Sequence, residues 1–218
     1  MKIGTDGILL GAWASSKGKA QGIDIGTGTG VIAIMMCQKN PLIKIDAIEI
    51  SGEATKDALL NFNNCKWKKN ISLLNKDLKK YLPNYKYDLI ISNPPYFNSG
   101  YLPNNKDKSL AKHIESLDYN DVLNFANKQL TQNGTVNLIL PYSSYANCKK
   151  KADEHQLYCK RECVVYPNIR KDPSRILLEL SKEKHQIETK KLIIEKEKRH
   201  DYTEDYKKLT RDFYTIFN

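Results

Sequence analysis

Residues 87–96 have the sequence Tyr87-Asp88-Leu89-Ile90-Ile91-Ser92-Asn93-Pro94-Pro95-Tyr96. The apolar run that ends at Ser92 predicts a strand buried on both faces, as in a parallel sheet. Two consecutive prolines cannot continue a central strand, so the chain must leave the sheet at Asn93. The turn therefore lies at the carboxyl end of a strand, which is the edge at which open α/β sheets bind ligands.

This turn predicts a site that holds a planar amino group. The amide oxygen of Asn93 and the carbonyl of Pro94 can both accept hydrogen bonds from one –NH2 group. The ring of Tyr96 can stack on the face of the same group. We therefore expect Asn93, Pro94, Pro95 and Tyr96 to be the catalytic positions for an exocyclic amine or a carboxamide. A plain strand-ending turn is the alternative explanation of this motif.

Strand and helix signals alternate around this turn, which predicts a parallel sheet with crossover helices. Apolar runs predict strands at residues 20–25, 43–50, 71–74, 87–92, 135–140, 162–166, 176–181 and 191–195, with antiparallel members among the last three. Amphipathic periodicity predicts helices at residues 53–64 and 119–131, and a stretch that is apolar nearly all round and stopped by Asn40-Pro41 predicts a helix at residues 31–39. Asn133-Gly134 is expected to stop the third helix, and Thr203 to cap a last helix that runs to Phe217.

Composition and charge point to a polyanionic partner. The chain has 218 residues, with 35 Lys and Arg against 25 Asp and Glu, a net charge of +10. Such an excess favours nucleic acid, although a lysine-rich surface kept for solubility is an alternative. No apolar run is long enough for a membrane span and the start lacks the shape of a signal peptide, so we expect no membrane partner and a cytoplasmic location. The five cysteines form no paired zinc-binding spacing, and no metal is expected.

A glycine-rich turn follows the first predicted strand, in the stretch Asp24-Ile25-Gly26-Thr27-Gly28-Thr29-Gly30. Its spacing is G-x-G-x-G, and Val31 stands where a dinucleotide-binding turn would need the last glycine. A pyrophosphate is therefore disfavoured, whereas the Asp24 carboxylate suits a cationic ligand. The turn predicts cofactor contacts at Asp24, Gly26, Thr27, Gly28 and Gly30.

Two further carboxylates end the next two predicted strands. Glu49 has the position of a residue that accepts both ribose hydroxyls, and Asp77 can accept from an adenine amino group. Ribose, adenine and a positively charged centre together describe S-adenosylmethionine, with S-adenosylhomocysteine as the product. We expect this cofactor in place of a nicotinamide dinucleotide, with Asn93 also lining its pocket.

The order of Asp24 to Gly30, Glu49, Asp77 and Asn93-Pro94-Pro95-Tyr96 resembles the class I S-adenosylmethionine-dependent methyltransferases that modify planar amino groups. Two stretches at the chain ends are similar to the bacterial tRNA1(Val) adenine-N6 methyltransferases: residues 2–14, Lys-Ile-Gly-Thr-Asp-Gly-Ile-Leu-Leu-Gly-Ala-Trp-Ala, and residues 202–214. The resemblance implies a Rossmann-like α/β fold, with helices on both faces of a mostly parallel, seven-stranded sheet. It also implies a tRNA substrate whose target is the adenine just 3′ of the anticodon.

The resemblance also implies roles for parts of the chain. Asn93 and the Pro94 carbonyl would hold the adenine amino group, Tyr96 would stack on the extruded base, and Thr5 and Asp6 would line the methyl-donor pocket. Residues 1–218 are expected to form a single, monomeric domain with a cofactor-capping segment at 1–19, a substrate loop at 97–113 and C-terminal strands and a helix at 150–218. We expect tRNA contacts from Lys112, Lys149, Lys150, Arg170, Lys171 and Arg175.

Several alternatives use the same motif. Release-factor methyltransferases present it to a glutamine side-chain amide, and other relatives methylate bases of ribosomal RNA or DNA. The basic charge favours RNA over a protein substrate. A non-catalytic RNA-binding protein that keeps the fold is a further alternative, and the intact set of Asp24, Glu49, Asp77 and Asn93 argues against it.

Overall fold

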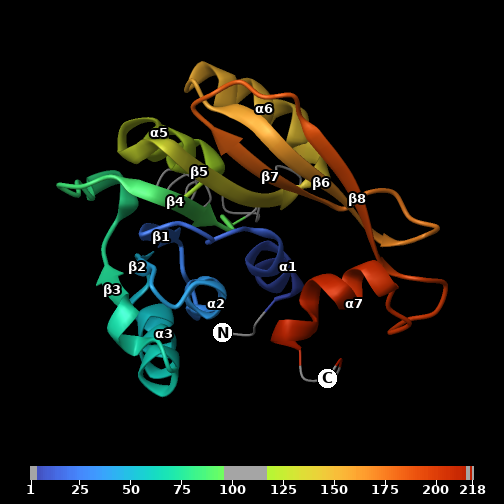
Figure 1. The fold of residues 1–218 in the computed structure, drawn as a ribbon, viewed down its shortest axis with the longest axis horizontal. Coiled ribbons are helices and arrows are strands. Elements are labelled where there is room, and N and C mark those ends of the chain that lie inside the picture. Colours follow the sequence, from blue (N-terminus) through green and yellow to red (C-terminus); the bar gives the residue numbers. More distant parts are fainter. Residues whose placement is uncertain (1–3, 96–116, 215–216, 218) are drawn as a thin grey trace, which may run out of the picture.

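The computed structural model describes residues 4–95, 117–214 and 217. These residues form one eight-stranded sheet with helices on both faces (Figure 1). The strand order is β3-β2-β1-β4-β5-β7-β6-β8. The expected α/β architecture is confirmed, but the sheet has one strand more than the seven that the family resemblance implied.

Each strand predicted from the sequence is present, and those after β4 are longer than predicted. The strands are β1 (Gln21–Ile25), β2 (Lys44–Glu49), β3 (Ile71–Asn75), β4 (Tyr87–Ser92), β5 (Leu130–Pro141), β6 (Tyr158–Asn168), β7 (Arg175–Ser181) and β8 (Glu188–Glu195). Strands β1 to β5 pair in parallel, β7 is antiparallel to both of its neighbours, and β8 is parallel to β6. The antiparallel member expected near the C-terminus is therefore β7.

Six α-helices accompany the sheet in the described part of the chain: α1 (Thr5–Trp13), α2 (Val31–Lys39), α3 (Gly52–Asn64), α5 (Tyr119–Gln129), α6 (Tyr145–Glu154) and α7 (Glu204–Thr210). Helices α1, α2, α3 and α7 cover one face of the sheet, whereas α5 and α6 cover the other (Figure 1). None of the described helices is long and apolar enough to cross a membrane. Helices α1 and α6 were not predicted from the sequence.

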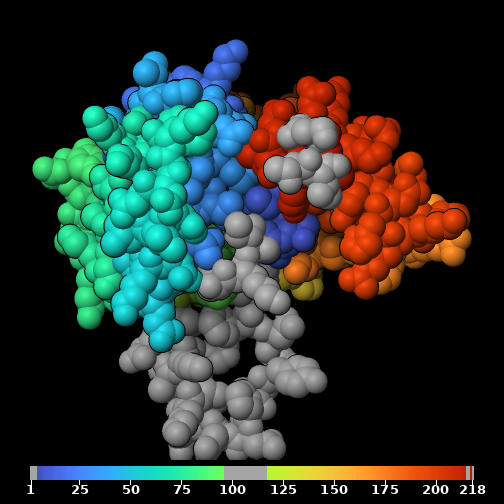
Figure 2. Space-filling model, turned by 90° about the horizontal axis from the view of Figure 1, so that it is seen from below, coloured from blue at the N-terminus to red at the C-terminus, as the bar shows by residue number. Residues whose placement is uncertain are grey.

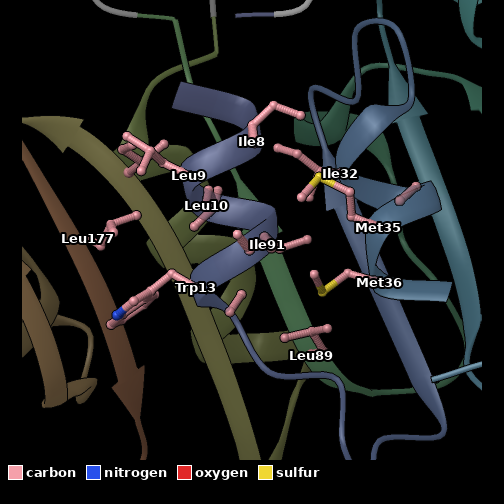
Figure 3. Close-up of a cluster of buried hydrophobic side chains, with 14 of the residues drawn as sticks. Ile8, Leu9, Leu10, Trp13, Ile32, Met35, Met36, Leu89, Ile91 and Leu177 are labelled. Atoms are coloured by element: carbon pink, nitrogen blue, oxygen red, sulfur yellow. The ribbon is translucent and has the colours of Figure 1, made fainter. Parts of the chain in front are cut away.

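The alternation of side chains along β4 divides the interior into two cores. Leu89 and Ile91 face the core beneath α1, α2, α3 and α7, and Ile90 faces the core beneath α5 and α6. Figure 3 shows the first core, with Ile8 of α1 directed toward Ile32 of α2. This two-sided burial explains why β4 is apolar throughout its centre.

Helix α1 runs beside α2 in close contact. A Cβ atom at Gly7 would lie 3.5 Å from the Val31 side chain, and one at Gly11 would lie 2.5 Å from the Met35 sulfur. A side chain at Gly7 would make only an ordinary contact, whereas glycine at position 11 leaves room for the Met35 side chain. The Lys39 ammonium at the end of α2 donates to the carbonyls of residues 11, 12 and 14 and so caps the end of α1. Both helices consequently begin at the same edge of the sheet.

The structure corrects the expected boundary after α5. Asn133-Gly134 lies within β5 and does not stop the helix, which ends at Gln129. Tyr87 of β4 pairs with Leu130, whereas Leu89 pairs with Thr135, so β5 carries an irregular insertion between these two pairs. The turn-forming residues thus mark a bulge in a strand.

The last helix begins as predicted but is shorter. The Thr203 side chain accepts a hydrogen bond from the Tyr206 N–H at 3.2 Å and caps α7. The α-helix ends at Thr210, and a 3-10 turn, Arg211–Phe213, follows it. The prediction of one continuous helix to Phe217 was therefore wrong.

Candidate active site at the carboxyl edge of the sheet

A pocket of about 410 Å³ lies where the carboxyl ends of β1, β2 and β4 meet. It is lined by Ile25, Gly26, Gly28, Ile48, Glu49, Ile50, Lys76, Asp77, Leu78, Lys79, Asn93, Pro95 and Leu117. This edge is the ligand-binding edge of open α/β sheets. The glycine turn, both predicted strand-end carboxylates and the Asn-Pro-Pro turn therefore meet in one cavity.

The glycine turn between β1 and α2 depends on left-handed backbone conformations. The φ angles of Gly26, Gly28 and Gly30 are +69°, +56° and +81°, which favour glycine. A Cβ atom at Gly26 would lie 3.1 Å from Leu117, and one at Gly30 would lie 2.3 Å from the ring of Phe62. Gly26 and Gly28 line the pocket, whereas Gly30 lets α3 pack against the turn.

Asp24 lies beneath this turn and is completely buried. Its Oδ2 atom accepts hydrogen bonds from the Thr27 hydroxyl at 2.6 Å and from the Ala33 N–H at 3.2 Å. Its Oδ1 atom is buried and has no hydrogen-bond partner among the described residues. Burial raises the pKa of Asp24 to about 7, against the lowering effect of the two hydrogen bonds. Asp24 and Thr27 thus support the turn from below, and neither lines the pocket.

Glu49 at the end of β2 is held in a fixed orientation. Its Oε2 atom accepts from the Gly28 N–H at 3.0 Å, and its Oε1 atom accepts from the Ser51 N–H at 2.9 Å. Each carboxylate oxygen keeps a further lone pair, so the group can still accept from two hydroxyls. The hydrogen bond to Gly28 also ties this carboxylate to the glycine turn.

Asp77 lines the pocket just after β3, which lies on the other side of β2 from β1. Its Oδ1 atom accepts from the Lys79 N–H at 2.9 Å and caps the short 3-10 helix η2, Leu78–Lys80. Leu78 is the first residue of this helix, so its backbone N–H has no intrahelical partner. The Asp77 carboxylate and the Leu78 N–H therefore offer a hydrogen-bond acceptor and a donor side by side.

The sequence analysis missed the apolar wall of this pocket. Ile50 is 59% exposed although it is a large apolar residue, and it lines the pocket together with Leu78 and Leu117. The sequence could have predicted this contact, because Ile50 directly follows Glu49, the carboxylate at the end of β2. An exposed aliphatic residue at a ligand-binding edge offers a surface for a flat ring.

The Asn-Pro-Pro turn enters the pocket from β4. Asn93 and Pro95 line the cavity, whereas Pro94 is buried. The Ser92 hydroxyl donates to the Ile25 carbonyl at 2.8 Å and fixes the end of β4 against β1. Tyr96, Lys112 and the predicted substrate loop at 97–113 lie outside the described residues.

The expected contact of Thr5 and Asp6 with this pocket is not seen. The Asp6 carboxylate accepts from the Arg175 Nε atom at 2.8 Å, and Thr5 lines a second cavity. Arg175 was predicted to contact RNA; its side chain is 32% exposed and its guanidinium pairs with Asp6. This ion pair joins the start of α1 to the start of β7.

The other basic residues predicted to bind RNA fall into two groups. The Lys149 ammonium lies 3.8 Å from the Glu162 carboxylate and 3.2 Å from the Tyr145 hydroxyl, so its charge is already compensated. Lys150 and Lys171 are exposed. Arg170 is exposed too and forms a surface ion pair with Glu197 at 3.1 Å.

The sequence matches known proteins over nearly its whole length. A family model described as the methyltransferase small domain matches residues 4–140. A tRNA1(Val) (adenine(37)-N6)-methyltransferase of Trichodesmium erythraeum is 38% identical, over 98% of this chain and 91% of that protein. Proteins of the same name from Histophilus somni and Bacteroides thetaiotaomicron are each 37% identical, over 100% and 98% of this chain and over 92% and 90% of their own lengths.

Solved structures share the fold. A predicted O-methyltransferase from Agrobacterium tumefaciens superimposes with a TM-score of 0.73 at 18% identity, covering 95% of this chain and 96% of that one. A ribosomal protein L11 methylase from Lactobacillus delbrueckii gives a TM-score of 0.57 at 20% identity, over 82% and 77% of the two chains. Fold, pocket and sequence therefore agree, and the chain belongs to the methyltransferase small domain family and, within it, to the tRNA1(Val) (adenine(37)-N6)-methyltransferases.

Proposed function

We propose that the protein transfers a methyl group from S-adenosylmethionine to the N6 atom of an adenine in tRNA, at position 37 next to the anticodon. The observation that carries the proposal is the position of Asn93 in the same pocket as Glu49 and Asp77. The wall that contains Glu49 and Asp77 then suits an adenosyl group, and the turn after β4 suits a planar amino group. The relatives named above carry this activity in their names.

The described residues fit the methyl donor. Glu49 would accept from the ribose hydroxyls, and Asp77 would accept from the adenine amino group while the Leu78 N–H would donate to the ring. Ile50 and Leu78 would offer apolar surface to the ring. Asp24 does not line the pocket, but its charge beneath the glycine turn, with an unpartnered Oδ1, would attract the cationic end of the ligand through the turn. Bound S-adenosylmethionine supplies an electrophilic methyl group on a sulfonium centre.

The target amine needs to be positioned more than it needs to be deprotonated by a general base. The lone pair of an adenine amino group is delocalised into the ring and is a poor nucleophile. The Asn93 side-chain oxygen and the Pro94 carbonyl would accept hydrogen bonds from its two N–H groups, which localises the lone pair toward the methyl donor. After transfer, the extra proton on nitrogen leaves to water. Holding the two reactants in line supplies a large share of the barrier reduction.

Access to an anticodon-loop base requires that the base leave its stack. Enzymes that modify bases extrude the target into a pocket and stack it against an aromatic ring. Tyr96 has this role in the proposal. The net charge of +10 attracts the phosphate backbone of the RNA.

The test is transfer of labelled methyl from S-adenosylmethionine to unmodified tRNA, followed by nucleoside analysis. We expect N6-methyladenosine from the wild type. Asn93→Ala should lose about 100-fold or more of the rate, because it removes an interaction aimed at the reacting group. The affinity of this variant for S-adenosylhomocysteine should stay within a few fold of wild type.

Asn63→Ala is the matched control, because Asn63 is an exposed asparagine on α3 away from the pocket. It should leave the rate unchanged. Label in a different nucleoside would contradict the proposed target. Label in a release factor, with none in tRNA, would contradict the RNA substrate.

A further inference from the structure

A second cavity of about 340 Å³ lies beside the start of α1 and is lined mainly by aromatic residues from the chain end. Its aromatic lining consists of His200, Tyr202, Tyr206, Tyr214 and Phe217. Figure 2 shows the C-terminal residues (red) next to those of α1 (dark blue). Nothing in the proposed methyl transfer uses this cavity.

The rings that line the cavity are held by one another. Tyr206 is only 2% exposed and forms the base of the cluster. Tyr202 stacks on it at a centroid distance of 5.2 Å, and Phe217 meets Tyr202 edge-on at 5.3 Å. Tyr202 and Phe217 keep part of their surface exposed. Rigid, partly exposed aromatic rings are the usual platforms for nucleic-acid bases.

A tight turn places a cation at the rim of this cavity. The Glu195 carboxylate accepts from the His200 N–H at 2.9 Å, and the Lys196 N–H donates to the Asp201 carbonyl at 2.7 Å. His200 has a φ of +67°, a conformation that non-glycine residues rarely adopt. The turn presents Arg199, which lines the cavity, is exposed and has no carboxylate partner within the described ranges.

The register of the sheet places both cavities on one edge. Arg175 at the start of β7 pairs with Pro141 at the carboxyl end of β5 and with Val165 near the end of β6. The ends of β6 and β8 therefore share the edge at which β4 ends. Pro167, Ile194 and Glu195 line the second cavity from these strand ends. Three to four strand spacings separate it from β4, about 14 to 19 Å along the sheet.

We infer that this aromatic cavity binds one unpaired nucleotide of the RNA substrate, with its base against Tyr202 and its phosphate beside Arg199. The inference rests on the proposed function for the identity of the RNA. A cluster that only anchored α7 would need no cavity and no exposed arginine at its rim. A nucleotide a few positions from the target adenine would reach this cavity along the shared edge.

The test uses an unmodified anticodon stem-loop RNA with 2-aminopurine at one loop position at a time, bound to the full chain in the presence of S-adenosylhomocysteine. Stacking on tyrosine quenches 2-aminopurine, so one position other than the target should be quenched. Tyr202→Leu keeps apolar bulk but removes the ring. It should abolish that quench and weaken binding by about 5- to 100-fold.

Arg199→Ala tests the rim independently of the rings. It should weaken RNA binding. It should also make the plot of log affinity against log salt concentration shallower, by the slope that one phosphate contact contributes. Lys68→Ala is the matched control, because Lys68 is an exposed cation next to the start of β3, at the opposite edge of the sheet. It should bind RNA like the wild type.

The outcomes separate this inference from the proposed function. Wild-type affinity and quenching in a folded Tyr202→Leu protein, together with wild-type binding by Arg199→Ala, would overturn the nucleotide site. Methyl transfer to tRNA would then still stand. If the variants lose RNA binding but the wild type makes no N6-methyladenosine, the cavity is supported and the proposed reaction fails. If the wild type binds no stem-loop RNA, both fail.

Discussion

Burial of the Asp24 carboxylate couples the stability of the free protein to pH. Its pKa of about 7 in the folded protein lies above the ordinary aspartate value of 3.8. Between these two values the folded state holds a proton that the unfolded state has lost, so stability falls as pH rises from about 4 through 7. We expect the melting temperature of the ligand-free protein to fall between pH 5.5 and 8. Thermal unfolding across this range measures the effect.

Asp24→Asn is the matched variant for this prediction, because an amide oxygen keeps an acceptor for Thr27 and Ala33 but does not titrate. Its melting temperature should lack the part of the decline that Asp24 contributes. Binding of S-adenosylhomocysteine, whose ammonium group favours the carboxylate, should release a proton near pH 6.5 in the wild type only. Calorimetry in two buffers with different ionisation enthalpies counts that proton. Equal pH profiles for the two proteins would show that Asp24 is ionised throughout.

At the scale of elements, the junction between β1, α2 and α3 depends on Gly30. A Cβ atom there combines an unfavourable φ of +81° with a 2.3 Å approach to the Phe62 ring. We expect Gly30→Ala to lower the free energy of unfolding by about 2 to 4 kcal/mol, the sum of backbone strain and overpacking. Urea unfolding measures this loss.

Gly52→Ala provides the comparison for Gly30→Ala. Gly52 begins α3, and no atom lies within 4 Å of a Cβ built on it. This substitution should be neutral or stabilise the protein by up to about 1 kcal/mol. A Gly30→Ala protein as stable as the wild type would mean that α3 moves away from the glycine turn without cost.

Elements with a clear period or a clear stop signal were predictable, and those with neither were not. Strand β4 was predicted at its observed bounds because its apolar run ends at two prolines. Helix α1 was missed because it is apolar nearly all round: it is enclosed by the sheet and the neighbouring helices, and seven of its nine residues are buried. Helix α6 was missed for the opposite reason, because it buries only Cys148 and Ala152.

The pocket was predictable from strand ends, but the side-chain partners were not. Glu49, Asp77 and Asn93 line one cavity because parallel strands bring their carboxyl ends to one edge. The pairing of Asp6 with Arg175 joins residues 169 positions apart, and a single sequence contains no local signal for such a contact. Charge alone therefore did not reveal that Arg175 and Lys149 pair with carboxylates of the protein.

At the scale of the whole molecule, the net charge is +10, and exposed lysines lie at both edges of the sheet. The carboxyl edge carries the pocket proposed for S-adenosylmethionine and the aromatic cavity. It also carries the connection between β6 and β7, which includes Lys171. The opposite edge carries Lys68 in the 3-10 turn before β3. Both lysines are exposed, and neither has a carboxylate partner among the residues that the structure describes. They differ mainly in the edge on which they lie.

The salt dependence of tRNA binding should therefore distinguish the two edges. Each phosphate neutralised by a lysine contributes a slope of about −0.7 to −0.9 to the plot of log affinity against log salt concentration. We expect Lys171→Ala to make the slope shallower by about that amount and Lys68→Ala to leave it unchanged, although both remove one charge. Fluorescence titrations at several sodium chloride concentrations measure both slopes. Equal reductions for the two variants would mean that net charge alone attracts the RNA, and no reduction for Lys171→Ala would remove the β6–β7 connection from the binding surface.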